Sequence, residues 1–270
     1  MADGPLTVAV LLNSASVREW QRRALAALLH SDSVDARVET VLVNDADAAG
    51  SSSLGDHFSE FSLWKVLRAV HLVTQQVTGQ PWHEQRTDIA ELDWFADAET
   101  IRCHPQSATG LGNTLPDGAV EKLGAADVAV RFGFGIVKGD ALTAPTHGML
   151  SYHHGDLRKY RGRPAGFHEF VRGEKTAGVT VQTLTESLDG GDIAAFAEVP
   201  IHDATSWHEV LSRLYDASEG LLTTAVKNAV SGDLIRDPPQ GTLYTLPSSR
   251  ETLLYLREKL KRPYDLPGSA

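Results

Sequence analysis

Apolar residues recur along the chain in short runs that alternate with stretches of helical spacing. Residues 6–12 are almost continuously apolar, which predicts a strand buried on both faces of a sheet. Further strands are predicted over residues 37–43, 100–103, 127–134, 148–153, 178–184, 193–199 and 241–246. Helices are predicted over residues 17–29, 58–77, 118–123, 165–172, 206–230 and 249–261. Because strands alternate with helices over most of the chain, the sequence predicts an α/β fold with a mostly parallel sheet.

The pattern also predicts one internal boundary, near residue 204. Residues 1–204 contain most of the alternating elements and are expected to form the main domain. Residues 205–270 are expected to form a short helical and β extension packed on that domain. Residues 44–88 match no motif, so we expect any specificity particular to this chain to lie there.

Composition and charge narrow the classes of function. The chain has 270 residues and a formal net charge of −10, which disfavours nucleic acid because phosphate contacts need clustered Lys and Arg. Basic residues cluster over 158–163, where an anionic ligand and a solvated loop fit the pattern equally well. The single cysteine, Cys103, excludes an intrachain disulfide and a thiolate metal cage. Since no apolar run has membrane-spanning length and no signal-peptide pattern is present, we expect a cytoplasmic protein without a membrane partner.

Three expected strand ends carry unusual residues, over 132–137, 151–156 and 188–192. Ligands of open α/β sheets bind outside the carboxyl ends of the strands. Glycines let a ligand approach the backbone, and a histidine beside a carboxylate can move a proton near neutral pH. Each feature alone is weak, because a glycine pair is usually a turn and a lone histidine is usually structural. Neighbouring side chains of a strand point to opposite faces, so His153 and His154 do not predict a metal site.

Together these segments resemble the catalytic core of the folate-dependent formyltransferases. That family includes glycinamide ribonucleotide transformylase, methionyl-tRNA formyltransferase and the sugar N-formyltransferases. Its signature is Asn-x-His on a strand, then a Leu-Pro-x-Tyr/Trp-x-Gly loop, then a Leu-Asp-x-Gly turn after a further strand. In this sequence residues 148–153 correspond to the first strand, residues 156–162 to the loop, and residues 188–191 to the turn. The match covers about seventy residues, and its elements follow the order of the family.

The resemblance implies a Rossmann-like sheet, 10-formyltetrahydrofolate as the formyl donor, and a set of site residues. His153 would stabilise the oxyanion formed when an amine attacks the formyl carbon, and Asp189 would orient His153 and relay protons through water. Ser151 would occupy the position of the family's third catalytic group. Backbone groups of one segment would contact the pterin, and the turn around Asp189 would close over the same ligand. These cofactor-binding residues would be Phe134, Gly135, Ile136, Val137, Leu188 and Gly190.

Several positions depart from the family's pattern. Ser151 stands where the family has Asn, and losing one such donor typically costs about 10²–10³ in rate. A serine hydroxyl can donate too, and His154 is a second candidate donor, although a solvent-facing loop residue is the simpler interpretation. Gln182 stands where the family commonly has His. The turn after the first strand, residues 13–16, lacks the glycines of ribonucleotide-binding members, which disfavours a ribonucleotide acceptor.

The resulting hypothesis is transfer of a formyl group from 10-formyltetrahydrofolate to a primary amine of a small metabolite, such as a nucleotide-linked amino sugar. Two alternatives stay open: a formyltetrahydrofolate hydrolase, and a non-catalytic ligand-binding member of the fold. The expected partners are folate and the acceptor, with no nucleic acid. The C-terminal helix and the strands before it offer a face for a homodimer.

Overall fold

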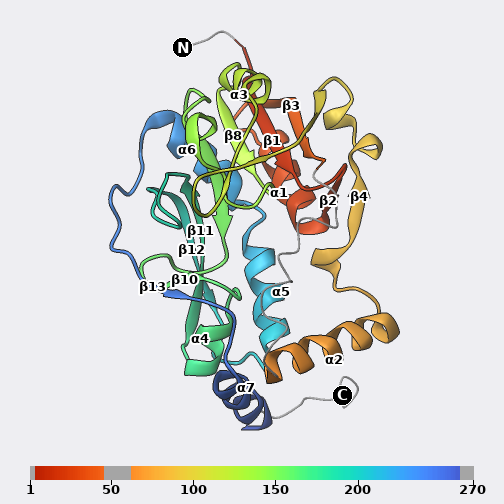
Figure 1. The fold of residues 1–270 in the computed structure, drawn as a ribbon, viewed down its shortest axis with the longest axis vertical. Helices are drawn as coiled ribbons and strands as arrows, with labels where there is room; N and C mark the ends of the chain where they lie inside the picture. The colour runs from red at the N-terminus through yellow and green to blue at the C-terminus, as the bar shows by residue number, and fades with distance from the viewer. Residues whose placement is uncertain (1–3, 46–61, 262–270) are drawn as a thin grey trace.

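The computed structural model describes residues 4–45 and 62–261 (Figure 1). Part of the region without a motif over 44–88, including the start of the predicted helix over 58–77, lies outside the described residues. The main feature is a seven-stranded sheet with the strand order β12-β11-β9-β8-β1-β3-β5. The five strands from β9 to β5 are parallel, and β11 runs antiparallel to both β9 and β12. The prediction of an α/β fold with a mostly parallel sheet is therefore confirmed.

The seven strands are β1 (Leu6–Leu12), β3 (Ala36–Asn44), β5 (Glu99–Cys103), β8 (Val128–Arg131), β9 (Met149–His153), β11 (Thr176–Thr183) and β12 (Ile193–Pro200). Three small two-stranded sheets pair β2 (Ser16–Arg18) with β4 (Arg86–Asp88), β6 (Gln106–Ser107) with β7 (Asn113–Thr114), and β10 (Tyr160–Gly162) with β13 (Thr242–Tyr244). The helices are α1 (Glu19–Leu29), α2 (Leu63–Thr78), α3 (Asp117–Gly124), α4 (Phe167–Arg172), α5 (Trp207–Ala217), α6 (Leu221–Ser231) and α7 (Ser249–Lys261). Short 3-10 turns occur over Trp82–Glu84, Ile89–Glu91, Asp93–Phe95 and Gly139–Leu142.

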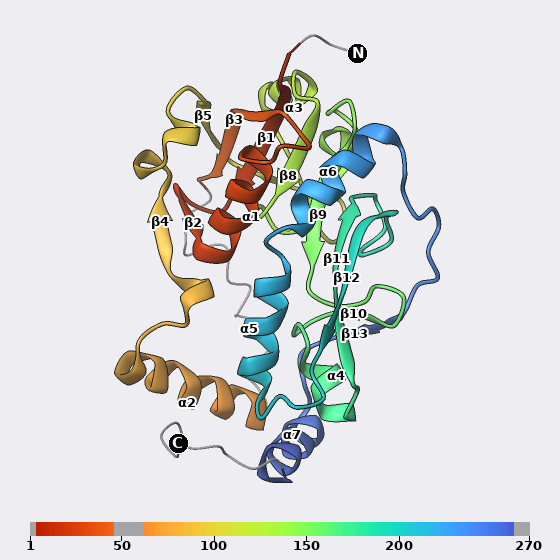
Figure 2. The same ribbon diagram turned by 180° about the vertical axis from the view of Figure 1, so that it is seen from behind.

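The sheet has a core on each face because side chains alternate along its strands. Val8 and Val10 of β1 belong to the core that also holds α1 and α6. Ala9 and Leu11 belong to the opposite core, which holds α3. Figure 2 shows α1 and α6 lying over one face of the strands. β1 is thus covered on both faces, as its nearly continuous apolar sequence predicts.

Two predicted elements are wrong in detail. The helix expected over 206–230 is two helices, α5 and α6, separated at residues 218–220. Ser218 is fully buried, and its carbonyl accepts a hydrogen bond of 2.7 Å from the Tyr152 hydroxyl, while Gly220 favours the end of a helix. The strand expected over 127–134 ends at Arg131, because Phe134 and Gly135 both take positive φ angles, +68° and +63°.

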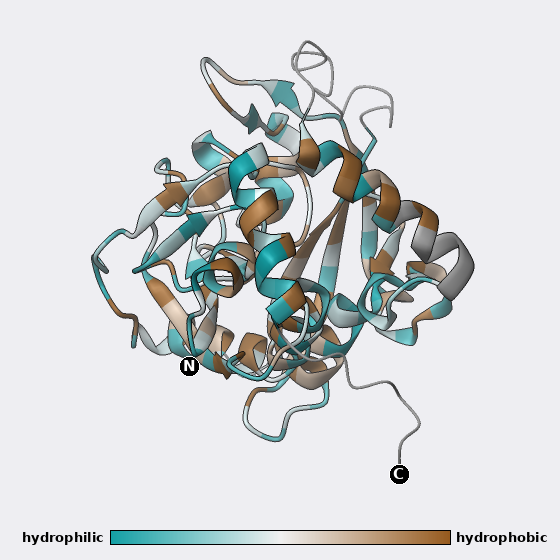
Figure 3. Cartoon of the chain, turned by 90° about the horizontal axis from the view of Figure 1, so that it is seen from below, coloured by the Kyte–Doolittle hydropathy of each residue, from teal (hydrophilic) through white to brown (hydrophobic). Residues whose placement is uncertain are grey.

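The helices α2, α4, α5 and α7 gather at one end of the molecule (Figures 1 and 2). Hydrophobic and hydrophilic residues alternate along the helices at this end (Figure 3), as expected for helices with one buried face. On α7, Leu253, Leu254, Leu256 and Leu260 stay exposed. None of the helices in the described residues is both long enough and apolar enough to span a bilayer.

Candidate functional site

The predicted pair His153 and Asp189 is brought together at the carboxyl end of β9. Nδ1 of His153 lies 3.9 Å from Oδ2 of Asp189, and both side chains are mostly buried. Nε2 of His153 lies 2.9 Å from the carbonyl oxygen of Tyr160, which can only accept, so Nε2 carries a hydrogen. A Cβ at Gly155 would lie 2.7 Å from Nε2, so glycine at this position leaves room for the ring. The nitrogen of His153 that remains for exchange with a ligand is therefore Nδ1, on the Asp189 side.

Asp189 is fixed by the turn between β11 and β12. Its backbone has a positive φ of +49°, and its two oxygens accept hydrogen bonds from different elements. Oδ2 accepts from the backbone N–H of Gly162 and Oδ1 from the side-chain amide of Gln182, both at 3.2 Å. The amide oxygen of Gln182, Oε1, accepts a hydrogen bond from the N–H of Gly191. Gln182 thus holds the carboxylate and its turn, although the sequence singled it out only as a departure.

A row of polar side chains crosses three neighbouring strands beside this pair. Arg131 of β8 pairs in register with Ser151 of β9, which pairs in register with Gln182 of β11. The guanidinium of Arg131 donates from Nη2 to Ser151 Oγ at 2.9 Å, and Ser151 Oγ in turn faces the backbone carbonyl of Arg131 at 3.3 Å. Arg131 was missed in the sequence. A cation at the end of an otherwise apolar strand, Val128–Arg131, is the signal that was available.

His154, the second candidate donor, directly follows β9 and points to the side opposite His153. Its Nε2 lies 3.0 Å from Ser218 Oγ, and its ring packs edge-on against Trp20, which is buried. Burial lowers the pKa of His154 to about 3, with a further contribution from His153, so the ring is neutral at physiological pH. Both interpretations from the sequence are wrong: His154 neither faces the site nor lies on a solvated loop. The reason is the alternation of side chains along the strand.

The two predicted cofactor segments face each other across the site. Residues 134–137 follow β8, and the turn with Leu188 and Gly190 lies opposite. Lys138 Nζ contacts the backbone carbonyl of Glu186 at 2.6 Å, and Glu186 Oε1 accepts from the N–H of Gly139 at 2.8 Å. Some backbone groups of the first segment already have partners. The N–H of Phe134 donates to Asn13 Oδ1, the carbonyl of Gly135 accepts from Arg131, and that of Ile136 accepts from Asn113.

Gly133 allows the chain after β8 to lie against the end of β1. A Cβ at Gly133 would overlap the backbone of Leu12 and Asn13, so only glycine permits the end of β8 to approach the end of β1 this closely. The approach places Asn13, Phe134 and Arg131 around one point at the carboxyl edge of the sheet.

Comparison with known proteins agrees with this geometry. Residues 108–226 match the family model described as formyl transferase. These residues are thus similar to formyl transferases. A curated relative, methionyl-tRNA formyltransferase of Halalkalibacterium halodurans, is 32% identical over 120 residues, which are 44% of this chain and 38% of that protein. The chain therefore aligns with well under half the length of that relative.

Solved formyltransferase structures share the fold over most of the chain. Glycinamide ribonucleotide transformylase 1 from Symbiobacterium toebii superposes with a TM-score of 0.56 at 18% identity, covering 90% of this chain and 96% of that one. The N-formyltransferase from Helicobacter canadensis, in complex with folinic acid and dTDP-3-aminofucose, gives a TM-score of 0.56 at 12% identity, covering 98% and 84%. The α/β fold of the formyl transferase family thus extends beyond the matched segment.

A hollow of about 150 Å³ is lined mainly by residues that precede the matched segment, together with Phe132 from within it. It is bordered by Arg18, Arg86 and the turn after β1. Nη1 of Arg86 donates to the hydroxyls of Ser14 and Ser16 at 3.2 and 3.1 Å. Two arginines and two hydroxyls form a surface that suits an anionic group.

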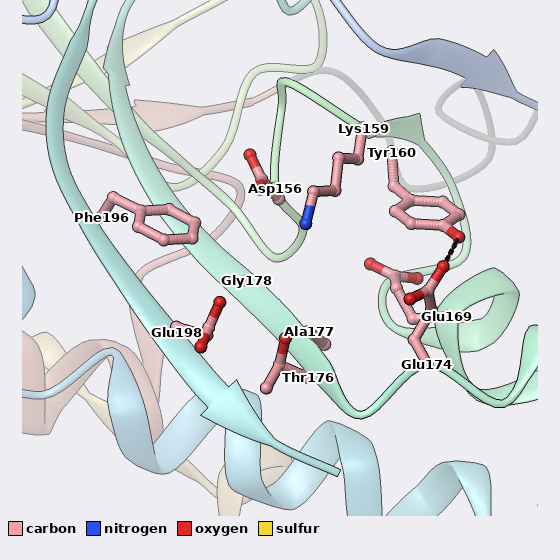
Figure 4. A pocket seen from close by; sticks show the side chains of 10 residues that line it. All are labelled: Asp156, Lys159, Tyr160, Glu169, Glu174, Thr176, Ala177, Gly178, Phe196 and Glu198. Carbon is pink, nitrogen blue, oxygen red and sulfur yellow. Dashed lines mark hydrogen bonds between the residues drawn. The ribbon is translucent and has the colours of Figure 1, made fainter. Parts of the chain in front are cut away.

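A second, very small pocket lies within the matched segment, beside the loop that carries Asp156, Lys159 and Tyr160 (Figure 4). Tyr160 donates to Glu174 at 2.7 Å, and Glu169 lies next to them. Glu169 is 3% exposed, and its Oε1 has no hydrogen-bond partner in the described part of the chain. Burial raises the pKa of Glu169 from 4.5 to about 7. The folded protein therefore holds a proton on Glu169 more strongly than the unfolded chain does.

We predict that Glu169 makes the free energy of unfolding fall as the pH rises from about 4.5 to 7. Over this range the folded state keeps the proton and the unfolded state releases it, so stability present at low pH is lost through the folded pKa. At about 1.4 kcal/mol per pKa unit, the upper limit is about 3 kcal/mol. Urea unfolding across this pH range should show the decline in the wild type and a flatter profile in Glu169→Gln. Glu198→Gln, at an exposed carboxylate of the same pocket, is the control. Parallel profiles for wild type and Glu169→Gln would contradict the prediction.

Proposed function

We propose that the protein transfers a formyl group from 10-formyltetrahydrofolate to a primary amine of a small metabolite. The observation that carries the proposal is the pair His153 and Asp189, 3.9 Å apart at the carboxyl end of a parallel strand. The match of residues 108–226 to the formyl transferase model supports it. This edge of the sheet is also where ligands of α/β proteins bind.

The residues at the site suit the donor substrate. To bind a pterin that bears a formyl group, the protein needs backbone hydrogen-bonding groups along the edge of the ring and polar side chains near the formyl group. We infer that residues 134–137 provide the edge, and that Leu188 and Gly190 line the opposite wall. The side chains of Phe134 and Val137 are buried in the core and fix the backbone of this edge, and the polar row of Arg131 and its neighbours follows from β8. The donor supplies the electrophilic formyl carbon.

His153, with Asp189 beside it, then accepts the proton that the acceptor amine loses. A primary amine loses a proton as its nitrogen bonds to the formyl carbon, and a positioned group must accept that proton. Nδ1 of His153 is the ring nitrogen directed into the site, because Nε2 is bonded to the Tyr160 carbonyl. Asp189 faces Nδ1 and stabilises the ring while it carries the additional proton. The proton finally passes to the folate nitrogen that leaves.

We further propose that the acceptor carries an anionic group, as a nucleotide-linked amino sugar does. The hollow with Arg18 and Arg86 adjoins the site through Asn13 and Phe132, which line it. The net charge of −10 disfavours a nucleic-acid acceptor but leaves this local basic surface available to a small anion.

The test is to mix the purified protein with 10-formyltetrahydrofolate and a panel of amines that includes nucleotide-linked amino sugars. We expect release of tetrahydrofolate that depends on one class of amine, with the formylated amine identified by mass spectrometry. Formate release without any amine would instead identify a hydrolase. Folate binding by calorimetry without either product would identify a non-catalytic binding protein.

A further inference from the structure

The Ser151 hydroxyl is already engaged on both sides. It accepts from Nη2 of Arg131 at 2.9 Å, and it is the donor to the Arg131 backbone carbonyl at 3.3 Å. A hydroxyl has one hydrogen, so Ser151 has none left for a ligand oxygen. The residue at the position of the family's asparagine therefore holds Arg131 and does not itself present a donor to the site.

The hydrogen bonds of Arg131 described above do not use all of its N–H donors. Nη1 donates to the carbonyls of Gly133 and Gly135, and one hydrogen of Nη2 goes to Ser151. A guanidinium has five N–H groups, so the second hydrogen of Nη2 and the Nε hydrogen remain. Nε is buried and has no hydrogen-bond partner in the described residues. This cation is held in a fixed orientation with part of its donor set unused.

The surroundings of Arg131 favour a partner that carries negative charge. Burial lowers the pKa of Arg131, and Asp189 is the charged group that acts in the opposite direction. Both oxygens of Asp189 are already bonded, to Gly162 and Gln182. A buried cation without a contacting anion is costly, and that cost falls when negative charge develops beside it.

We propose that Arg131 is the group that stabilises the oxyanion in formyl transfer, and that Ser151 is a positioning residue that holds its guanidinium. The inference rests on the proposed function, which uses His153 for the proton, and it assigns the oxyanion to a different group from the one that the resemblance implies. A charged donor of this kind makes stronger hydrogen bonds than a neutral amide. The small side chain of serine leaves the space over β9 that the guanidinium occupies.

The amine nitrogen forms a bond to the formyl carbon, and the C=O π electrons move onto the oxygen, which becomes an oxyanion next to Arg131. The carbonyl then re-forms as the bond from carbon to the folate nitrogen breaks, and the electron pair stays on that nitrogen. The proton lost by the amine is carried by His153 to the same nitrogen. The products are the formylated amine and tetrahydrofolate.

The first test compares kcat of Arg131→Met and Ser151→Ala. Methionine removes the charge and donors but fills the buried volume. We expect kcat to fall about 10²–10³-fold in Arg131→Met, as for other lost oxyanion donors. Ser151→Ala should cost about ten-fold, and Ser151→Thr, which keeps the hydroxyl, should lose less.

Added methylguanidine should restore part of the rate of Arg131→Ala, which a structural role would not allow. A greater loss in Ser151→Ala than in Arg131→Met would overturn the proposal. Arg37→Met, at an exposed ion pair on β3, is the control.

The second test needs no acceptor. Calorimetry compares binding of 10-formyltetrahydrofolate and tetrahydrofolate to the wild type and to Arg131→Met. We expect the wild type to prefer the formylated folate by about ten-fold, the typical effect of a charged hydrogen bond, and Arg131→Met to lose that preference. Equal preference in both proteins, or none in the wild type, would overturn the role of Arg131 while leaving folate binding intact. Failure of the wild type to bind either folate would instead reject the proposed function, and this inference with it.

Discussion

Replacing His153 by alanine is expected to lower kcat for formyl transfer by about 10³-fold, and Asp189→Asn by about 10²–10³-fold. A positioned general acid or base contributes about 10²–10⁴ in rate. His153 is positioned twice, by the Tyr160 carbonyl on Nε2 and by Asp189 near Nδ1. Asparagine at 189 keeps the size of the side chain but removes the charge that stabilises a protonated ring. Rates of tetrahydrofolate release at saturating folate measure both effects.

The two residues are expected to act as one unit. The double variant His153→Ala/Asp189→Asn should be no slower than the slower single variant, because removing one partner already disables the other. His202→Ala, at an exposed histidine outside the site, is the matched control and should keep the wild-type rate. Retention of more than about a tenth of the wild-type kcat in His153→Ala would remove His153 from the proposed mechanism.

Replacing Phe167 by alanine is expected to lower the free energy of unfolding by about 3–5 kcal/mol, the usual cost of truncating a buried aromatic side chain. Phe167 is fully buried at the start of α4. Its ring centroid lies 5.2 Å from that of Trp64 on α2, 5.6 Å from Trp207 on α5 and 5.7 Å from Tyr255 on α7. Removing the ring would leave a cavity where these four helices meet, since they converge on this one side chain.

Urea unfolding measures this loss. Leu260→Ala, on α7 but 87% exposed, is the control and should change stability by less than about 0.5 kcal/mol. A loss below about 1 kcal/mol in Phe167→Ala would mean that the four helices repack without the ring. We propose that residues 205–270 are an extension of a catalytic part formed by residues 1–204. Under that proposal Phe167 is a main contact between them, because Trp207 and Tyr255 both belong to the extension.

Some contacts of the site residues could be predicted from the sequence, and others could not. His153 ends β9 and Asp189 follows β11, and it was the resemblance to the formyltransferase pattern that paired them. The strand ends alone do not, because β11 runs antiparallel to β9. Ser151 was singled out as a departure, but its partner Arg131 was not found. Arg131 is twenty residues away in the chain, and only the parallel register of β8 with β9 sets the two side chains beside each other. His154 was assigned to the wrong surroundings because its neighbours, Trp20 and Ser218, come from distant helices and connections.

The sequence by itself determined the alternation of strands and helices, the mostly parallel sheet and the two segments that form the His153 and Asp189 pair. These follow from local patterns, since apolar runs and turn residues act over a few neighbouring positions. Only the tertiary structure decided the break between α5 and α6, the face on which His154 lies and the engagement of Ser151 with Arg131. Each of these depends on strand register and on contacts between residues far apart in the chain. Such contacts form only when the whole core packs, so no local pattern records them.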